Sequence, residues 1–139
     1  MSHFQDAKQL RHEGVMTMLA AAVAKAEVIG QPQCVVIVDQ SGEPMGEIRM
    51  TGSKFLSRRS ALAKALTAAS HNIPSDAIPE AVRPAVAAAT DGGATGLSGG
   101  LPIRLGGMVL GGVGVGSGAP EQDVAVARAA LAAIGADEV

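Results

Sequence analysis

Arg49 is the charged side chain best placed to bind an anionic group. It lies in an expected strand, Met45–Met50, on the same face as Glu47, because side chains alternate along a strand. A guanidinium can bind a carboxylate through two parallel hydrogen bonds. An ion pair with Glu47 or Asp39 would satisfy Arg49 equally well, so the sequence leaves both roles open.

Histidine supplies the candidate metal ligand. His12 begins the apolar stripe of an expected helix over residues 5–29, where a half-buried, neutral imidazole nitrogen could ligate a metal. A structural or intersubunit role would also suit this position. His71 lies at the end of a second expected helix, where the helix dipole favours a cation, and His3 lies in the N-terminal segment, where fraying is expected.

Glycines give the strand expected over Met108–Ser117 an unusually bare face. Alternation places five residues on that face: Met108, Leu110, Gly112, Gly114 and Gly116. A strand face without side chains allows close approach of another backbone or of a ligand. The pattern favours a helix packed on the strand, and a ligand surface at Gly114 and Gly116 is the second interpretation.

A second glycine pair precedes the expected strand Leu101–Leu105. The backbone N–H groups of Gly99 and Gly100 could bind an anion, whereas Pro102 has no N–H to donate. An ordinary strand entry explains the same residues. Arg104 is a weaker candidate of the same kind as Arg49.

Composition limits the classes of function. The chain has 139 residues, 47% of them hydrophobic and 1% aromatic, and a formal net charge of −2, which fits one domain over residues 1–139. Without a basic block, nucleic-acid binding is not expected. The single cysteine, Cys34, excludes an intramolecular disulfide and is expected to be buried. No signal peptide or membrane span is expected, so the predicted location is the cytoplasm.

The hydrophobic pattern predicts helices and two hairpins. Besides the helix over 5–29, helices are expected over 55–70 and 120–134, with Ser53 or Ser57 as the N-cap of the former. Strands 34–39 and 45–50 join at 40–43, and strands 101–105 and 108–117 join at Gly106-Gly107. The predicted fold is α/β of the α+β type, in the order α-β-β-α-(α)-β-β-α, with helices covering a central antiparallel sheet.

Three segments of the chain carry a joint pattern: VVIVDQSGEPMGEIRMTGS (35–53), RRSALAKALTAA (58–69) and GGLPIRLGGMVLGGVGVGSGAPEQDVAVARAAL (99–131). Together they resemble the GlcG/HbpS-like family, also called the haem-degrading domain or DUF336 family, which is related to the C-terminal domain of PduO-type proteins. Matching positions include Asp39, Gly42, Arg49, Met50, Gly52, Lys64, Ala65, Thr67, Ala68, Gly99, Gly100, Pro102, Ile103, Gln122 and Asp123. Thr51 stands where the family usually has Asp, and the segment 115–118 is one residue longer than the family pattern.

The resemblance implies a profilin-like fold, homo-oligomers that are often octamers, and a tetrapyrrole ligand. A haem-binding module is therefore the leading hypothesis. In it His12 would ligate the iron, Arg49 would bind a propionate, and Gly99, Gly100, Pro102, Gly114 and Gly116 would lie against the ligand.

Two alternatives remain. A cofactor-independent isomerase, tautomerase or lyase would anchor a small carboxylate or aromatic catabolite on Arg49 and move a proton with Asp39, Glu47 or a histidine. An oligomeric accessory subunit would need no chemistry at all.

Overall fold

Four strands form one antiparallel sheet. In the computed structural model, which describes residues 2–139, these are β1 (Cys34–Asp39), β2 (Pro44–Arg49), β3 (Gly100–Leu105) and β4 (Met108–Gly116). Their order in the sheet is β2-β1-β4-β3, and every neighbouring pair is antiparallel. Strand β1 is buried on both faces, as its continuous apolar run predicts. The expected sheet and both expected hairpins are confirmed.

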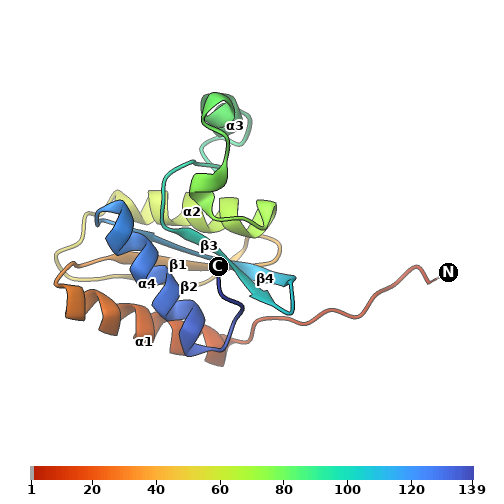
Figure 1. Ribbon diagram of the computed structural model, residues 1–139, viewed down its shortest axis with the longest axis horizontal. Coiled ribbons are helices and arrows are strands. Elements are labelled where there is room, and N and C mark those ends of the chain that lie inside the picture. The colour runs from red at the N-terminus through yellow and green to blue at the C-terminus, as the bar shows by residue number, and fades with distance from the viewer. Residues whose placement is uncertain (1) are drawn as a thin grey trace.

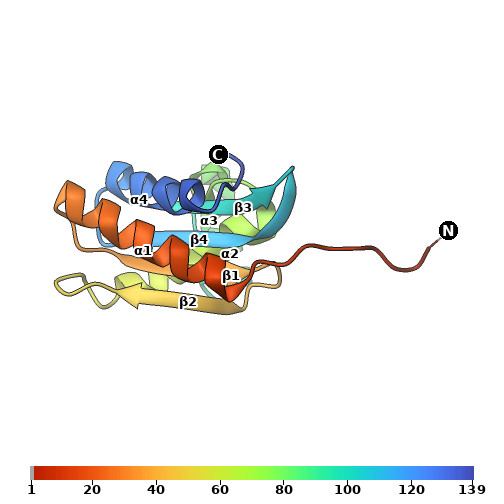
Figure 2. The same ribbon diagram turned by 90° about the horizontal axis from the view of Figure 1, so that it is seen from below.

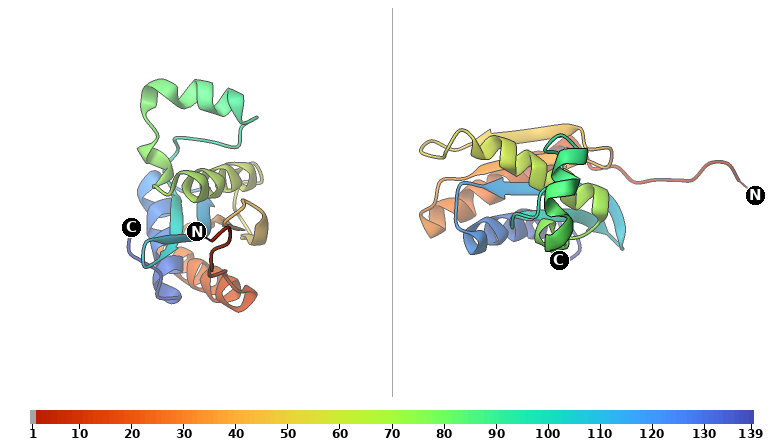
Figure 3. Two further views of the ribbon diagram at one scale, coloured as in Figure 1. Left: turned by 90° about the vertical axis from the view of Figure 1, so that its right-hand side faces the viewer. Right: turned by 90° about the horizontal axis from the view of Figure 1, so that it is seen from above.

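Helices cover both faces of this sheet. Helices α1 (His12–Ile29) and α4 (Pro120–Ala133) pack together on one face, and α2 (Ser57–His71) packs on the other (Figures 1 and 2). The short helix α3 (Arg83–Ala89) stands beyond α2, away from the sheet, as Figure 1 and the left panel of Figure 3 show. Two short 3-10 turns lead from α2 to α3, at Ser75–Ala77 and Glu80–Val82. The α+β class is therefore confirmed.

The core is built from small and branched aliphatic side chains. On the side of α1 and α4, the strand residues Val35, Ile37 and Val113 pack against a cluster that includes Val15, Met18, Ala22, Val126 and Leu131. On the other side, three alanines of α2 pack directly on β1, namely Ala61, Ala65 and Ala69. Small side chains let this helix approach the sheet closely.

The bare face of β4 lies under α2. A Cβ atom on Gly112 would clash with the carbonyl oxygen of Ala65, and one on Gly114 would clash with that of Ala61. A Cβ atom on Gly116 would lie 3.0 Å from the carbonyl oxygen of Ser57. Close packing of α2 therefore explains these glycines. The helix covers the face at Gly114 and Gly116 where the second interpretation placed a ligand.

The expected alternation of side chains along β4 is wrong for one residue, Leu110. Leu110 packs in the cluster on the α1 and α4 side, opposite to the face of Gly112. The cause is an irregularity in the β3–β4 pairing, where Ile103 pairs with Gly111 and Arg104 with Val109. The extra residue changes the face that the chain presents, as in a β-bulge.

Two expected helix starts are wrong. Helix α1 begins at His12 rather than at residue 5, after an extended Arg11 that gives no side-chain cap. Helix α2 begins at Ser57 after Leu56, so neither Ser53 nor Ser57 is its N-cap. The Ser53 hydroxyl donates instead to the carbonyl oxygen of Met50, closing the turn before α2. Among residues 2–139, none of the helices combines the length and apolar composition needed to cross a membrane.

Candidate functional site

The three residues predicted for proton transfer and carboxylate binding do not form a cluster. Asp39 stabilises the β1–β2 turn, where its Oδ1 accepts hydrogen bonds from the backbone N–H groups of Ser41 and Glu43 at 2.8 and 3.0 Å. Glu47 is paired with Arg58 of α2, with 2.8 Å between Oε1 and Nε. Among the described residues, Arg49 has an ion pair with neither acid. The carboxylates thus have structural partners, and Arg49 is left for another role.

Arg49 lines a groove between the C-terminal half of α1 and the end of β2, which we call the α1–β2 groove. Its volume is about 590 Å³. The lining residues are Val23, Ala26, Glu27, Gly30, Gln31, Pro32, Ile48, Arg49, Met50 and Thr51. Arg49 is the single cation in this set and Glu27 the single acid. The groove therefore combines an apolar wall with one positive and one negative side chain.

His12 lies at the opposite end of α1 from this groove. Its side chain is 80% exposed, and its Nδ1 lies 3.1 Å from Oε1 of Glu13. The expected half-buried position on the apolar stripe is wrong, because the buried stripe starts at Val15. Eleven residues separate His12 from Val23 in the groove, which is about 16 Å along a helix. One chain therefore does not bring His12 and Arg49 together.

His71 is also far from the groove. It is exposed at the end of α2, on the other face of the sheet, with Nδ1 3.1 Å from the carbonyl oxygen of Thr67. His3 lies in the extended segment before α1 (Figure 2). Among residues 2–139, no group of three or more His, Cys, Asp or Glu side chains could hold a metal ion.

The segment at Gly99 is a strand entry with structural hydrogen bonds. The N–H of Gly100 donates to Oγ of Ser75 at 2.9 Å, so it is not free to bind an anion. A Cβ atom on Gly100 would clash with the carbonyl oxygen of Lys64, so this glycine lets β3 approach α2. Pro102 is buried in the edge strand β3 opposite Gly112, a position where a missing N–H is tolerated.

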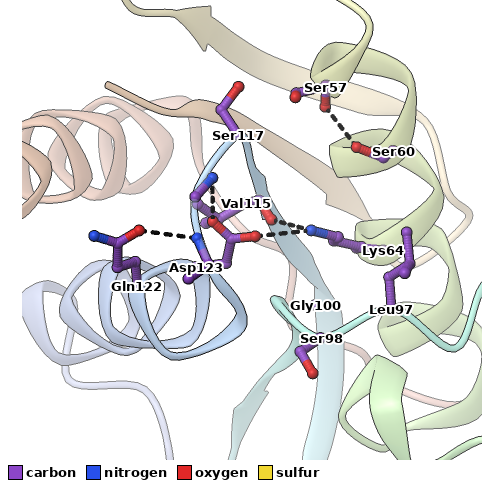
Figure 4. A network of polar contacts seen from close by, with 12 residues as sticks. Ser57, Ser60, Lys64, Leu97, Ser98, Gly100, Val115, Ser117, Gln122 and Asp123 are labelled. Carbon is purple, nitrogen blue, oxygen red and sulfur yellow. Dashed lines mark hydrogen bonds and ion pairs between the residues drawn. The ribbon is translucent and has the colours of Figure 1, made fainter. Parts of the chain in front are cut away.

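A buried ion pair that the sequence analysis did not assign lies beside Gly99. Nζ of Lys64 donates to Oδ2 of Asp123 at 3.1 Å and to the carbonyl oxygen of Val115 at 2.7 Å. The two side chains are only 5% and 4% exposed. Figure 4 shows how α2, β4 and the first turn of α4 bring these groups together.

The environment of Asp123 has two opposing effects on its acidity. Burial raises the pKa of its carboxyl above the usual 3.8, whereas the Lys64 ammonium and the hydrogen bond from the N–H of Gly118 partly oppose this rise. The effect of burial is the larger, because desolvation penalises the charged form. Oδ1 accepts the N–H of Gly118 at 3.0 Å, so both carboxylate oxygens have donors.

The sequence did contain a signal for this pair. Lys64 is the one charged residue in ALAKALTAA, a run in which nearly every neighbour is apolar. A lysine within such a helix segment is buried only with a partner. Asp123 lies in the first turn of α4, where the helix dipole alone would favour an acid, and no local pattern connects it with a residue 59 positions earlier.

Comparisons with known proteins define the class of this fold. The sheet and helices superpose on protein ORFY from Klebsiella pneumoniae with a TM-score of 0.92 and 29% identity, covering 99% of each chain. A structure described as the PduOC:heme complex gives a TM-score of 0.87 with 27% identity, over 94% of this chain and 98% of that one. A double mutant of HbpS from Streptomyces reticuli gives 0.83 with 29% identity, over 95% and 91%.

The family follows from the sequence match. The model of the family described as haem degrading protein HbpS-like matches residues 10–132, and the chain belongs to this family. It is also 30% identical over 135 residues to the corrinoid adenosyltransferase PduO of Citrobacter freundii, covering 94% of this chain. The PduO of Salmonella typhimurium is 31% identical over 119 residues. This chain spans 40% and 35% of the lengths of those two proteins.

Proposed function

We propose that this protein binds a tetrapyrrole, haem in particular, in the α1–β2 groove. The observation that carries the proposal is the groove itself, where Arg49 is the single cation and Glu27 the single acid on a largely apolar surface. A related structure of 27% identity is described as a haem complex, which supports the same ligand class. A flat apolar macrocycle with carboxylate arms requires both features of the groove.

The groove fits the macrocycle and its carboxylates. Val23, Ala26 and Ile48 offer apolar contact, and the Arg49 guanidinium can form a bidentate pair with a propionate. Bound haem would supply iron for redox or gas chemistry. The groove residues would bind and orient the ring and exclude water from one face of it.

The groove of one chain has no histidine for the iron. Met50 has a sulfur there, but this sulfur accepts the N–H of Gln33 at 3.4 Å. We therefore assign the iron ligand to His12 of a neighbouring copy, since His12 is exposed and has no core contact to lose. The protein would then act as a homo-oligomer, as in the octamers that the resemblance implies.

Hemin titration followed in the Soret region tests the proposal. The wild-type protein should shift the Soret band and saturate, and R49A should weaken binding about tenfold, because a hydrogen bond to a charged group is worth about 1.5–3 kcal/mol. R59A, which removes an exposed arginine of α2, is the matched control and should bind as the wild type does.

Metal-free protoporphyrin separates ring binding from iron ligation. H12A should alter the Soret position with hemin and leave protoporphyrin affinity unchanged, whereas H71A should alter neither. Unchanged hemin affinity in R49A would remove the groove from the proposal. An unshifted Soret band in the wild-type protein would reject haem as the ligand.

A further inference from the structure

A second pocket lies at the Lys64–Asp123 pair and shares no lining residue with the α1–β2 groove. Its volume is about 290 Å³. It is lined by Lys54, Ser57, Ser60, Lys64, Leu97, Ser98, Ser117, Gly118, Pro120 and Asp123. Figure 4 shows most of these residues around the ion pair. Two lysines and four serines make this lining much more polar than that of the groove.

Lys64 provides a buried donor at the base of this pocket. Its ammonium carries three N–H groups, and residues 2–139 supply acceptors for two of them, the carbonyl oxygen of Val115 and Oδ2 of Asp123. Buried donors are nearly always paired, because an unpaired one costs free energy. The remaining N–H is available to an acceptor in the pocket.

Ser117 holds a second donor there at a conformational cost. Its φ angle is +91°, in the left-handed region that favours glycine, so a serine at this position is strained. Glycine stands on both sides of it, so a third glycine would have avoided the cost. Oγ of Ser117 accepts the N–H of Lys54 at 3.0 Å, and its own O–H remains free to donate. This is the second feature that points to a ligand.

Two other hydroxyl groups of the pocket lining already donate hydrogen bonds within the protein. Ser60 donates to the carbonyl oxygen of Ser57 at 3.1 Å, and Ser98 donates to Oδ2 of Asp76 at 3.0 Å. The free donors are therefore Lys64, Ser117, the Ser57 hydroxyl and the Lys54 ammonium. All of these donate, so the pocket is suited to an acceptor group.

The charges of the lining favour a monoanion over a dianion. Lys64 and Asp123 largely cancel each other as a pair, so Lys54 is left as the net positive charge. A phosphate group carries a charge of about −1.5 to −2 at neutral pH, and the charge beyond the first would lie near the Asp123 carboxylate. A carboxylate matches the single net charge.

We propose that this pocket binds a small carboxylate, whose oxygens accept hydrogen bonds from the Lys64 ammonium and the Ser117 hydroxyl. Lys54 at the exposed end of the pocket adds attraction to the anion. The proposal does not depend on haem binding, because it concerns other residues and another ligand.

NMR of the Lys64 side chain tests the proposal directly. Acetate, benzoate and inorganic phosphate are titrated into protein carrying isotope-labelled lysine, at constant ionic strength. A carboxylate should shift the Lys64 signals with saturation, and phosphate should bind at least tenfold more weakly. S117G should weaken carboxylate binding about tenfold, and this variant is expected to fold because glycine adopts a positive φ readily.

Matched variants exclude a general charge effect. K54A should weaken carboxylate binding, and K25A, which removes a half-buried lysine of α1 that does not line this pocket, should leave it unchanged. Equal losses in K54A and K25A would overturn the proposal, as would saturable binding that leaves the Lys64 signals unmoved. Tighter binding of phosphate than of either carboxylate would overturn the assignment of the ligand class.

Discussion

At the scale of single residues, the polar groups of this chain divide into those with structural partners and those left free. Asp39 and Glu47 are bound to turn amides and to Arg58. Arg49 is left without an ion pair among the described residues, and Lys64 has one N–H without an acceptor among them. We therefore assign binding roles to Arg49 and Lys64, which keep donors without structural partners.

The Lys64–Asp123 pair should be sensitive to loss of one partner. K64M should destabilise the protein by about 3–5 kcal/mol, because it leaves a carboxylate buried without its cation. The double variant K64M/D123N should regain at least about 1 kcal/mol of this loss, since the uncharged amide oxygen can still accept the N–H of Gly118. Urea unfolding measures both values. Equal stability of K64M and the wild type would show that the pair is not buried.

At the scale of elements, the glycines of β4 determine how closely α2 can pack. G114A should destabilise the protein by about 1–3 kcal/mol or more, because its Cβ atom would clash with the Ala61 backbone in the centre of α2. G14A in α1 is the matched control. Its Cβ atom would meet only the flexible end of Leu10 at 3.3 Å, and alanine is favoured over glycine in a helix by up to about 1 kcal/mol.

Thermal or urea unfolding of the two variants decides between the interpretations of the glycine face. The helix-packing explanation requires G114A to be less stable and G14A to be at least as stable as the wild type. A fully stable G114A would mean that α2 does not lie tightly on β4.

The β3–β4 hairpin is tied to the C-terminal segment by Asp137. Its carboxylate oxygens accept the N–H groups of Gly106 and Gly107 at 3.0 and 2.7 Å, and these hydrogen bonds lower the pKa of Asp137 below the usual 3.8. A lowered carboxyl pKa contributes stability at pH values above 3.8, and this contribution is lost as the pH falls through the folded-state pKa.

Amide NMR signals of Gly106 and Gly107 should therefore titrate together with the Asp137 carboxyl, with a midpoint below pH 3.8. In D137N this titration should be absent. A midpoint at or above 3.8 in the wild-type protein would contradict the two hydrogen bonds.

The sequence predicted the elements better than the contacts between them. Period-two and helical patterns located all four strands and the three long helices, and Gly106-Gly107 marked a hairpin with two positive φ angles. The start of α1 was expected at residue 5, although the apolar stripe begins only at His12, where the helix begins. The face of Leu110 was missed because a bulge depends on the partner strand.

The sites were less predictable than the elements, because each site depends on contacts between segments that are distant in the sequence. Arg49 was identified from its strand position, but its groove depends on how α1 crosses beside β2. Lys64 and Asp123 meet only because the fold places the middle of α2 beside the first turn of α4, a tertiary contact that neither segment encodes alone. His12 was placed on a buried stripe by spacing, whereas its position at the first residue of α1 leaves it exposed.

At the scale of the whole molecule, exposed apolar side chains on α1 and β2 favour self-association. Met16 and Val28 of α1 are 67% and 81% exposed. Light scattering should give a mass that is a multiple of 13.9 kDa, and V28K should lower it. L105K, which changes an exposed leucine of β3, is the control and should leave the mass unchanged. A wild-type mass of one chain would exclude the shared haem site.

The position of iron in a hemin-soaked crystal shows whether haem binds in the α1–β2 groove. An anomalous difference map at the iron edge should show one peak in the α1–β2 groove, beside Ile48 and Arg49, with the imidazole of a neighbouring copy's His12 next to it. An iron peak elsewhere in the molecule, or none at full hemin saturation, would contradict the account.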